Sequence, residues 1–333
     1  MAPQVDVLIP VYGVEHFIAK CLLSVLVQDY KNMRVVLVED ASPDNSLAIA
    51  EQIIKQHNLH QHKVEIYKRV TNGGIGAVRE QLLSHLEGKY ALFIDSDDYW
   101  DNERVVTEWV NLAEEGNYEV VIANYCHEYP SENRSKSIAV NSGKEGKQLA
   151  CDSLKGTEGA YLWNKLFLSE TLIQYRSMIC PGRDLWEDLA VVVPLLYRAQ
   201  KVGYYPQTVL HYLHHGETQY TGGAKPNHIT ILKSILDDLD KELSQERKDN
   251  ALHRALNSAH IRAYLVCCKL PYRYYQAIRQ SGIKPQDGKI PPSFMEWSKK
   301  VMYLLASNRT TSFLGYLLIH GAVWMKRLLR YIV

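Results

Sequence analysis

The stretch ALFIDSDDYWD, residues 91–101, joins an apolar segment to a cluster of acidic side chains. Its first four residues predict a buried β-strand, and the acids that follow are Asp95, Asp97, Asp98 and Asp101. Carboxylates this close repel one another and raise each other's pKa unless a cation or hydrogen-bond donors lie among them. The stretch therefore predicts a positively charged partner at the end of a strand.

Three strand-then-helix units precede this stretch. VDVLIPVY at 5–12, RVVLV at 34–38 and KVEIYKRV at 63–70 predict strands, and each is followed by a loop and a helical pattern. Strands that alternate with helices in this way indicate an α/β fold, with a mostly parallel sheet flanked by helices. Ligands of such sheets bind beyond the carboxyl ends of the strands, so the loops PVYG, EDASPDNS, NGG and DSDD are expected to converge on one crevice.

The later part of the chain has a different pattern. Residues 130–158 are rich in Ser, Gly and Lys, which predicts a mobile insertion near the site, and residues 202–216 predict a strand pair or a strand with a turn. From residue 226 the pattern is helical. We therefore expect a nucleotide-binding and catalytic domain over residues 1–225 and a helical C-terminal extension over 226–333.

Composition excludes few function classes. Of the 333 residues, 38 are Lys or Arg and 37 are Asp or Glu, a net charge of +1, so no overall field favours nucleic acid or acidic membranes and no nucleic-acid partner is predicted. Six cysteines without C-x-x-C spacing, and an N-terminus without a basic leader, predict a cytoplasmic protein. The apolar residues 313–333 include Lys326, Arg327 and Arg330, which favours a peripheral membrane helix over a spanning one; a helix packed on the domain is the alternative.

The acids of DSDD have two interpretations. They could form a solvated turn in which Asp98 or Asp101 caps the next helix, or they could hold Mg²⁺ or Mn²⁺ together with nucleotide phosphates. Their place at the ligand edge of the sheet favours the second, with Asp101 left as a helix cap. Asp40, which ends another strand, could accept the imide N–H of a uracil, while Arg79 could reach a phosphate or be an ordinary surface arginine.

The order of these motifs resembles a known family. VLIPVYG, FIAKCLLSVLVQDY, VVLVEDASPDNS, NGGIGAVRE and ALFIDSDDYWD are similar to the nucleotide-binding half of family 2 glycosyltransferases, which have the GT-A fold. The resemblance is close over about residues 4–125 and looser to about 220. It implies an inverting, metal-dependent transferase with a nucleotide-sugar donor, a UDP-sugar, and a glycan or polyprenyl-diphosphate-linked acceptor in bacterial surface-polysaccharide synthesis. The processive-synthase motif Q-x-x-R-W is absent, which favours single additions.

The resemblance also implies roles for individual residues. The metal would be held by Asp97, Asp98 and His214, the last chosen from the late-loop histidines His211, His214 and His215. Where the family usually has paired aspartates the chain has Glu39 and Asp40, and it has Gly13 where Asn is usual. The nucleotide would be bound by Pro10, Val11, Tyr12, Asp40, Asn72, Arg79, Asp95 and Ser96.

A second acidic pair, Glu187 and Asp188, precedes an apolar helical run in RDLWEDLAVVV. Acids are favourable in the first turn of any helix, but an inverting transfer also needs a base for the acceptor hydroxyl. The resemblance implies Asp188 as this base, with Glu187 as the alternative. On the acceptor side it implies Trp163 and Lys165; a buried aromatic and a surface lysine are the alternatives for these two.

Two other functions share this pattern. A sugar-phosphate nucleotidyltransferase would have a similar sheet and acids, but PVYGVEHF lacks the basic, Gly-rich triphosphate loop expected after its first strand. A non-catalytic nucleotide- or glycan-binding protein would be expected to have lost Asp97 or Asp188. Both alternatives stay open at this point.

Overall fold

The computed structural model describes two compact units. The first comprises Met1–Ala150 and Gly159–Gln219, and the second Cys151–Glu158 and Tyr220–Val333. The division near residue 220 lies close to the predicted boundary at 225, whereas the assignment of 151–158 to the second unit was not predicted. The described residues are 2–58, 62–140, 143–215, 224–246 and 248–284, together with 306, 312, 314, 315 and 317–320.

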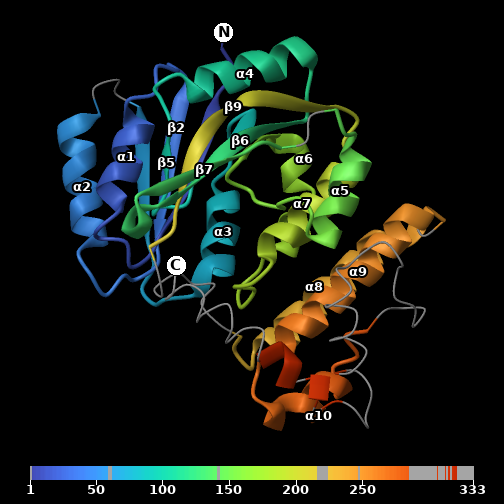
Figure 1. Ribbon diagram of the computed structural model, residues 1–333. Helices are drawn as coiled ribbons and strands as arrows, with labels where there is room; N and C mark the ends of the chain where they lie inside the picture. Colours follow the sequence, from blue (N-terminus) through green and yellow to red (C-terminus); the bar gives the residue numbers. More distant parts are fainter. Residues whose placement is uncertain are drawn as a thin grey trace. The chain divides into compact units, whose positions relative to one another are not determined.

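The first unit is built on one mixed sheet of nine strands among the described residues (Figure 1). Their order is β3-β2-β1-β4-β8-β6-β9-β5, and β7 pairs with β6. The pairs β1–β2, β2–β3, β1–β4 and β6–β9 are parallel, which confirms the predicted α/β fold. The strands are β1 (Val5–Val11), β2 (Met33–Glu39), β3 (Lys63–Lys68), β4 (Tyr90–Phe93), β5 (Tyr99–Trp100), β6 (Val120–Tyr129), β7 (Arg134–Ile138), β8 (Lys165–Leu168) and β9 (Val202–Leu213).

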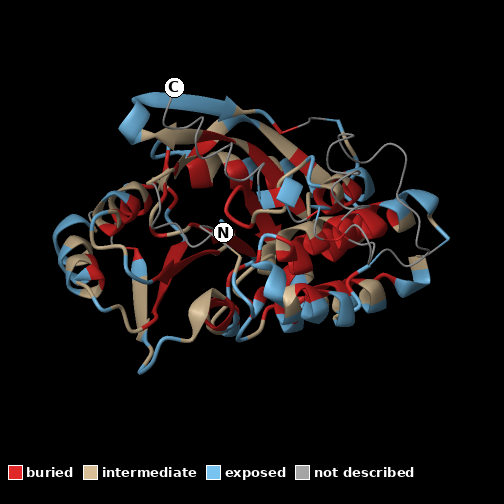
Figure 2. Ribbon diagram, turned by 60° about the horizontal axis from the view of Figure 1, so that its bottom comes forward, coloured by how far each residue is buried: buried red, intermediate tan, exposed pale blue. Residues whose placement is uncertain are grey.

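Helices flank this sheet. Every residue of β1 and β2 is buried, as expected for strands covered on both faces, and Figure 2 shows the central strands in the buried colour. Helix α3 packs on β1 and β2, α4 packs on β6 and β9, and α1 contacts α2. The helices of this unit are α1 (Ile18–Leu26), α2 (Ser46–His57), α3 (Gly74–Ser84), α4 (Val105–Gly116), α5 (Gly146–Lys155, which continues into the second unit), α6 (Ser169–Ile173) and α7 (Glu187–Arg198), with 3₁₀ turns η1 (Pro130–Glu132) and η2 (Arg176–Met178).

One local prediction was wrong, and one of two alternatives was decided. The segment 130–158 is not an unstructured insertion, because strand β7 pairs along β6 and helix α5 begins at Gly146. For the segment that begins at Val202 the single-strand alternative holds and the strand pair does not, because Val202–Leu213 form one long strand, β9. Its register against β6 shifts around Pro206, which has no N–H to donate, and Asn124 Nδ2 donates to the Pro206 carbonyl at 2.9 Å.

The described residues of the second unit are mainly helical. The described helices are α8 (His228–Glu242), α9 (Asn250–Cys267) and α10 (Tyr275–Gln280), with 3₁₀ turns η4 (Ser244–Glu246) and η5 (Tyr272–Tyr274). The Asp249 carboxylate caps α9, and Arg262 Nη1 on α9 donates to the Ser153 and Leu154 carbonyls. These last bonds explain why 151–158 groups with this unit. Within the described residues, none of the helices has the length and apolar character needed to cross a bilayer.

Candidate active site

The loops expected to converge do lie at one edge of the sheet. Strand β1 is parallel to both β2 and β4, so Tyr12, Asp40 and Asp95, which follow these three strands, emerge on the same side. The Asp40 N–H donates to the Val11 carbonyl at 2.9 Å. Pro10 and Val11 are buried, whereas the Tyr12 side chain is 47% exposed and presents its ring at this edge.

Asp40 organises the loop that begins α3. Its carboxylate accepts from the N–H groups of Gly73 and Gly74, at 2.9 Å each, and Arg69 Nε lies 2.8 Å from Oδ1. The Asn72 side chain donates to the Asp40 carbonyl at 3.3 Å. A carboxylate at a helix N-terminus is stabilised by the helix dipole. Arg69 was missed by the sequence analysis, although its place just before TNGG was a usable signal; the contact of Asp40 with a uracil stays a prediction.

Helix α3 also carries the most connected cation of the site, Arg79. Its side chain is 4% exposed, so the surface interpretation was wrong. Nη1 donates to Glu187 and to Asp188, and Nη2 donates to Asp95 Oδ1 at 3.0 Å. One guanidinium therefore joins the acid that ends β4 to the acidic pair that begins α7. Arg79 is thus held by carboxylates, and its predicted phosphate contact stays a prediction.

Gly76 lets α7 approach α3. A Cβ atom at this position would lie 2.4 Å from the Cys180 carbonyl oxygen and 2.7 Å from that of Arg183. Both distances are shorter than van der Waals contact, so a larger residue would push the segment before α7 away. The third glycine of NGGIG is therefore needed to bring Glu187 and Asp188 to Arg79.

The acids around Arg79 carry more negative charge than it neutralises. Burial raises the pKa of Asp95 to about 6, with Arg79 opposing the shift and Asp97 adding to it. Burial likewise raises the pKa of Glu187 to about 7, against the pull of Arg79. Asp188 Oδ2 accepts from the Leu162 N–H at 3.2 Å. The site is therefore one that a further cation would stabilise.

Asp97 and Asp98 differ in their surroundings. Asp98 is buried, its Oδ1 accepts from the Leu213 N–H at 2.9 Å, and its Oδ2 has no hydrogen-bond partner among the described residues. Burial, and then the neighbouring Asp97 and Asp95, raise the pKa of Asp98 well above its usual range. Asp97 is partly exposed, and Ser96, which lies between Asp95 and Asp97, is buried. Asp97 is thus the acid that a ligand can reach.

The histidine beside Asp97 is His215, not His214 as predicted. His215 Nε2 lies 2.8 Å from Asp97 Oδ2, and its ring stacks on Phe17. His214 Nε2 instead lies 2.9 Å from His127 Nδ1. Adjacent residues at the end of a strand point in opposite directions, so only one of the two can face the acids.

Asp101 is not a helix cap, which corrects another prediction. Helix α4 begins after Arg104, and no side chain caps it. Asp101 Oδ1 lies 2.8 Å from His211 Nε2, and His211 Nδ1 lies 2.8 Å from Glu128. The imidazole thus bridges two carboxylates across β5, β9 and β6, and the last acid of DSDDYWD fixes the short strand β5 in place.

The two predicted acceptor residues are buried. Trp163 stacks on Tyr161 and Tyr212, with ring centroids at 4.5 and 5.6 Å, so these neighbours lie where a sugar would stack. Lys165 is 1% exposed, and its Nζ donates to the Tyr161 carbonyl and to Asn164 Oδ1 at 2.7 Å each. The buried-aromatic alternative holds for Trp163, and Lys165 organises its own loop instead of meeting a phosphate.

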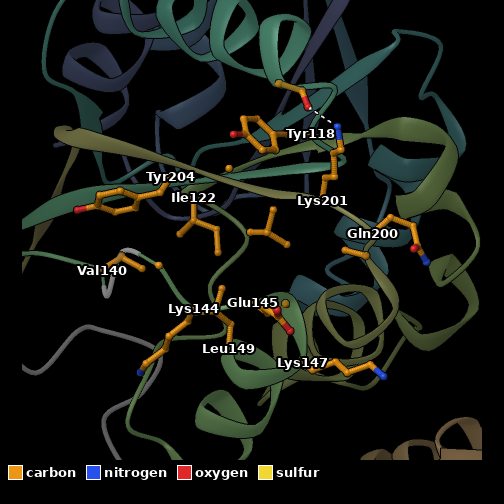
Figure 3. A pocket seen from close by; sticks show the side chains of 16 residues that line it. Tyr118, Ile122, Val140, Lys144, Glu145, Lys147, Leu149, Gln200, Lys201 and Tyr204 are labelled. Carbon is orange, nitrogen blue, oxygen red and sulfur yellow. Dashed lines mark hydrogen bonds between the residues drawn. The ribbon is translucent and has the colours of Figure 1, made fainter.

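A pocket elsewhere in the first unit contains none of the predicted site residues. Its volume is about 610 Å³, and it is lined by the starts of β9 and α5 with the segment around Tyr118 (Figure 3). Lys144 and Lys147 belong to one segment of its lining and Lys201 to another, and Lys201 Nζ donates to the Gly116 carbonyl at 3.3 Å. The acids at the carboxyl edge are therefore separate from this pocket.

The acids fit a divalent cation by their chemistry. Among the described residues, no three or more His, Cys, Asp or Glu side chains are placed to hold a metal ion by themselves. Asp97 and His215 offer an oxygen and a nitrogen side by side, and the unpartnered Asp98 Oδ2 marks an excess of acceptors. Carboxylate oxygens are the ligands that Mg²⁺ and Mn²⁺ prefer.

The fold and the acidic edge define an α/β domain of the GT-A class. Residues 6–165 match the family model described as Glycosyl transferase family 2, so this part of the chain is similar to that family. In overall fold the protein is similar to Staphylococcus aureus TarS 1–349 in complex with UDP-GlcNAc. That comparison has a TM-score of 0.70 and 19% identity, and it covers 97% of this chain and 92% of the other.

Curated relatives are matched over part of their length. The chain is 34% identical over 122 residues to the glycosyltransferase GlyA of Streptococcus pneumoniae, which covers 37% of this chain and 17% of GlyA. It is 24% identical over 212 residues to the processive diacylglycerol beta-glycosyltransferase of Mycoplasma pneumoniae, which covers 61% of each. The chain thus spans less than two thirds of either relative.

Proposed function

We propose that this protein is an inverting glycosyltransferase that moves a sugar from a nucleotide-sugar donor, a UDP-sugar, to a glycan or a lipid-linked acceptor. One observation carries the proposal. The acids that end β4 and the acids that begin α7 meet at a single buried guanidinium, Arg79. Donor binding and proton transfer require two such acidic groups that are distinct but adjacent.

The donor is assigned to the carboxyl edge of the sheet. The exposed ring of Tyr12 offers a stacking surface for a base, with Asp40 beside the same strand end. Asp95 and Ser96 are proposed to face the ribose. Asp97, with Asp98 and with His215 in place of His214, would hold Mg²⁺ or Mn²⁺. The cation would offset the charge that develops on the leaving diphosphate.

The base is assigned to the acidic pair of α7. Asp188 is the first choice, and Arg79 together with the Leu162 N–H fixes the orientation of its carboxylate. A specific observation favours Glu187 as the second candidate, because a pKa of about 7 suits a group that must accept a proton near neutral pH. In either case Arg79 is a positioning residue, since it touches both carboxylates and the donor-side Asp95.

The acceptor and the location of the protein belong to this proposal as well. The relative from Mycoplasma pneumoniae is named for a diacylglycerol acceptor and for processive addition. A lipid-borne acceptor, used at the cytoplasmic face of the plasma membrane in surface-polysaccharide synthesis, is the choice that this similarity supports. The same name argues against inferring single additions from the missing Q-x-x-R-W motif alone.

A ligand-binding experiment tests the donor assignment. The melting temperature of the purified protein is measured with UDP-GlcNAc, UDP-glucose, GDP-mannose or no ligand, each with Mn²⁺ or with EDTA. A ligand at 100 times its Kd stabilises the folded state by about 2.7 kcal/mol. We expect stabilisation by a uridine nucleotide that depends on Mn²⁺ and is lost in Asp97→Asn. Equal melting temperatures in all wells would contradict the proposed function.

A further inference from the structure

An exposed apolar face lies in the second unit. Leu314, Leu317 and Leu318 are helical and are 50%, 54% and 43% exposed. Their spacing of three and four residues puts them on one side of a helix. Ser312, Gly315 and Ile319 are buried, at the spacing of the opposite side. Three large apolar side chains within five residues thus face away from the protein.

Two hydrogen bonds place this helix against the segment that follows α9. The Tyr272 and Ser312 hydroxyls are 3.1 Å apart, and His320 Nε2 lies 3.2 Å from the Leu270 carbonyl oxygen. The Tyr272 side chain is itself 42% exposed. The apolar surface therefore consists of the leucine face, Leu314, Leu317 and Leu318, while Tyr272 contacts the helix at Ser312, on its buried side.

Exposed cations lie on the chain segment that contacts this helix. Lys269 and Arg273 are exposed on the segment that contacts the helix, and Arg279 and Lys284 are exposed shortly after it. In the sequence as a whole, residues 250–333 contain 13 Lys and Arg but only Asp287 and Glu296 as acids, a net charge of +11. Such a concentration of one sign of charge attracts polyanionic surfaces.

We infer that the leucine face docks on an anionic lipid bilayer. Leucines beside lysines and arginines are the composition of helices that lie in the membrane interface, where the apolar side enters the acyl boundary and the cations meet lipid phosphates. A soluble polyanion would use the charge but would leave the leucines in water. The docking goes beyond the proposed transfer reaction and stands on this surface alone.

A vesicle co-sedimentation experiment tests the inference with the full chain. Two kinds of vesicle are used: phosphatidylcholine alone, and phosphatidylcholine with about 30% phosphatidylglycerol. Each is mixed with wild type and with the triple variant Leu314→Ser, Leu317→Ser, Leu318→Ser. The matched control replaces three exposed apolar residues of the first unit, Val27→Ser, Val70→Ser and Ile173→Ser. We expect wild type and control to bind only the anionic vesicles, and the leucine variant to bind at least about tenfold more weakly.

A charge variant and a polyanion complete the design. Lys269→Gln with Arg273→Gln, like added salt, should weaken binding while the leucine face is intact. Equal binding by wild type and the leucine variant would overturn the inference, and so would binding of both to inorganic polyphosphate beads without any binding to vesicles. Melting temperatures of all variants identify those that fail to fold. Because no sugar transfer is measured, the result bears on the membrane location within the proposed function but is independent of the proposed transfer reaction.

Discussion

The two ends of the chain use charge in opposite ways. Residues 1–249 contain 25 Lys and Arg against 35 Asp and Glu, whereas residues 250–333 contain 13 against 2. In the first region the decisive charges lie inside the protein: the partly buried Asp95, Glu187 and Asp188 meet at the buried Arg79. In the described part of the second region Lys269, Arg273, Arg279 and Lys284 are exposed to solvent. These two net charges nearly cancel. For that reason the charge of the whole chain predicted no attraction to acidic membranes.

The difference teaches that burial decides what a charge can do. A buried carboxylate near other carboxylates shifts its pKa and binds a cation, because desolvation makes each unpaired charge costly. An exposed lysine keeps its hydration and acts at a distance that salt can screen. Changes in the first region should therefore alter chemistry with little effect on membrane binding, and changes in the second should do the reverse.

The largest effect is expected from the acidic pair of α7. Asp188→Asn should lower kcat by about 10²–10⁴-fold, because the variant cannot accept the acceptor proton. If Asp188 is the base, Glu187→Gln should lower kcat less than Asp188→Asn does. If Glu187 is the base, Glu187→Gln should lower kcat more. Initial rates with a UDP-sugar donor measure both. Vesicle binding should be unchanged in both variants, so a loss there would break the proposed separation of roles.

Arg79→Lys should have the next largest effect. A lysine ammonium keeps the charge but is a single point, so it cannot reach Asp95 and the α7 pair with two fixed nitrogens. We expect kcat to fall by about 10–100-fold, the cost of about 1–3 kcal/mol for misplaced groups, with a smaller change in donor KM.

Arg104→Lys is the matched control for this substitution, because Arg104, just before α4, is exposed and pairs with Glu108 four residues later. It should leave kcat and KM unchanged. A wild-type kcat in Arg79→Lys would argue that Arg79 only holds the fold together. The same conclusion would follow if the loss of kcat were no larger than in other variants whose melting temperature falls by the same amount.

Much of the fold followed from the sequence because its strands are buried on both faces. Apolar runs such as VDVLIPV and MRVVLVE leave few alternatives, and DSDD at a strand end located the acidic edge. The short strand β5 was not predicted, since two residues carry no periodicity. For the long β9 a strand pair and a single strand both stayed open, because Pro206 interrupts its pattern at the bulge.

The site residues were harder to predict because their roles depend on tertiary contacts. Nothing in GAVRE shows that Arg79 is buried by acids more than 100 residues away along the chain. The choice between His214 and His215 depends on which of the two side chains faces Asp97. Because adjacent residues of a strand point to opposite faces, an error of one residue in the register selects the wrong histidine. Neither the predicted acceptor role of Lys165 nor its alternative, a surface lysine, indicated burial, because lysine is almost never fully buried without partners; here its partners are carbonyls of its own loop.

The smallest predicted effect is a pH dependence of stability caused by Glu187. Its pKa is about 7 in the folded protein against a reference value of 4.5. Its contribution to the free energy of unfolding is therefore fully present below about pH 4.5 and is lost as the pH rises through about 7, because the folded state must then carry a buried charge.

Glu187→Gln removes this titration. The melting temperature of wild type minus that of the variant should fall by about 5–10 °C between pH 5 and pH 8, which corresponds to about 2.5 kcal/mol for a unit of this size. Val70→Ser, an exposed substitution without a titrating group, should keep a constant difference from wild type over the same range. A constant difference for Glu187→Gln as well would mean that Arg79 fully offsets the cost of burying this acid. The buried region would then be balanced without a further cation, and the contrast with the exposed charges of the C-terminal region would lose its physical basis.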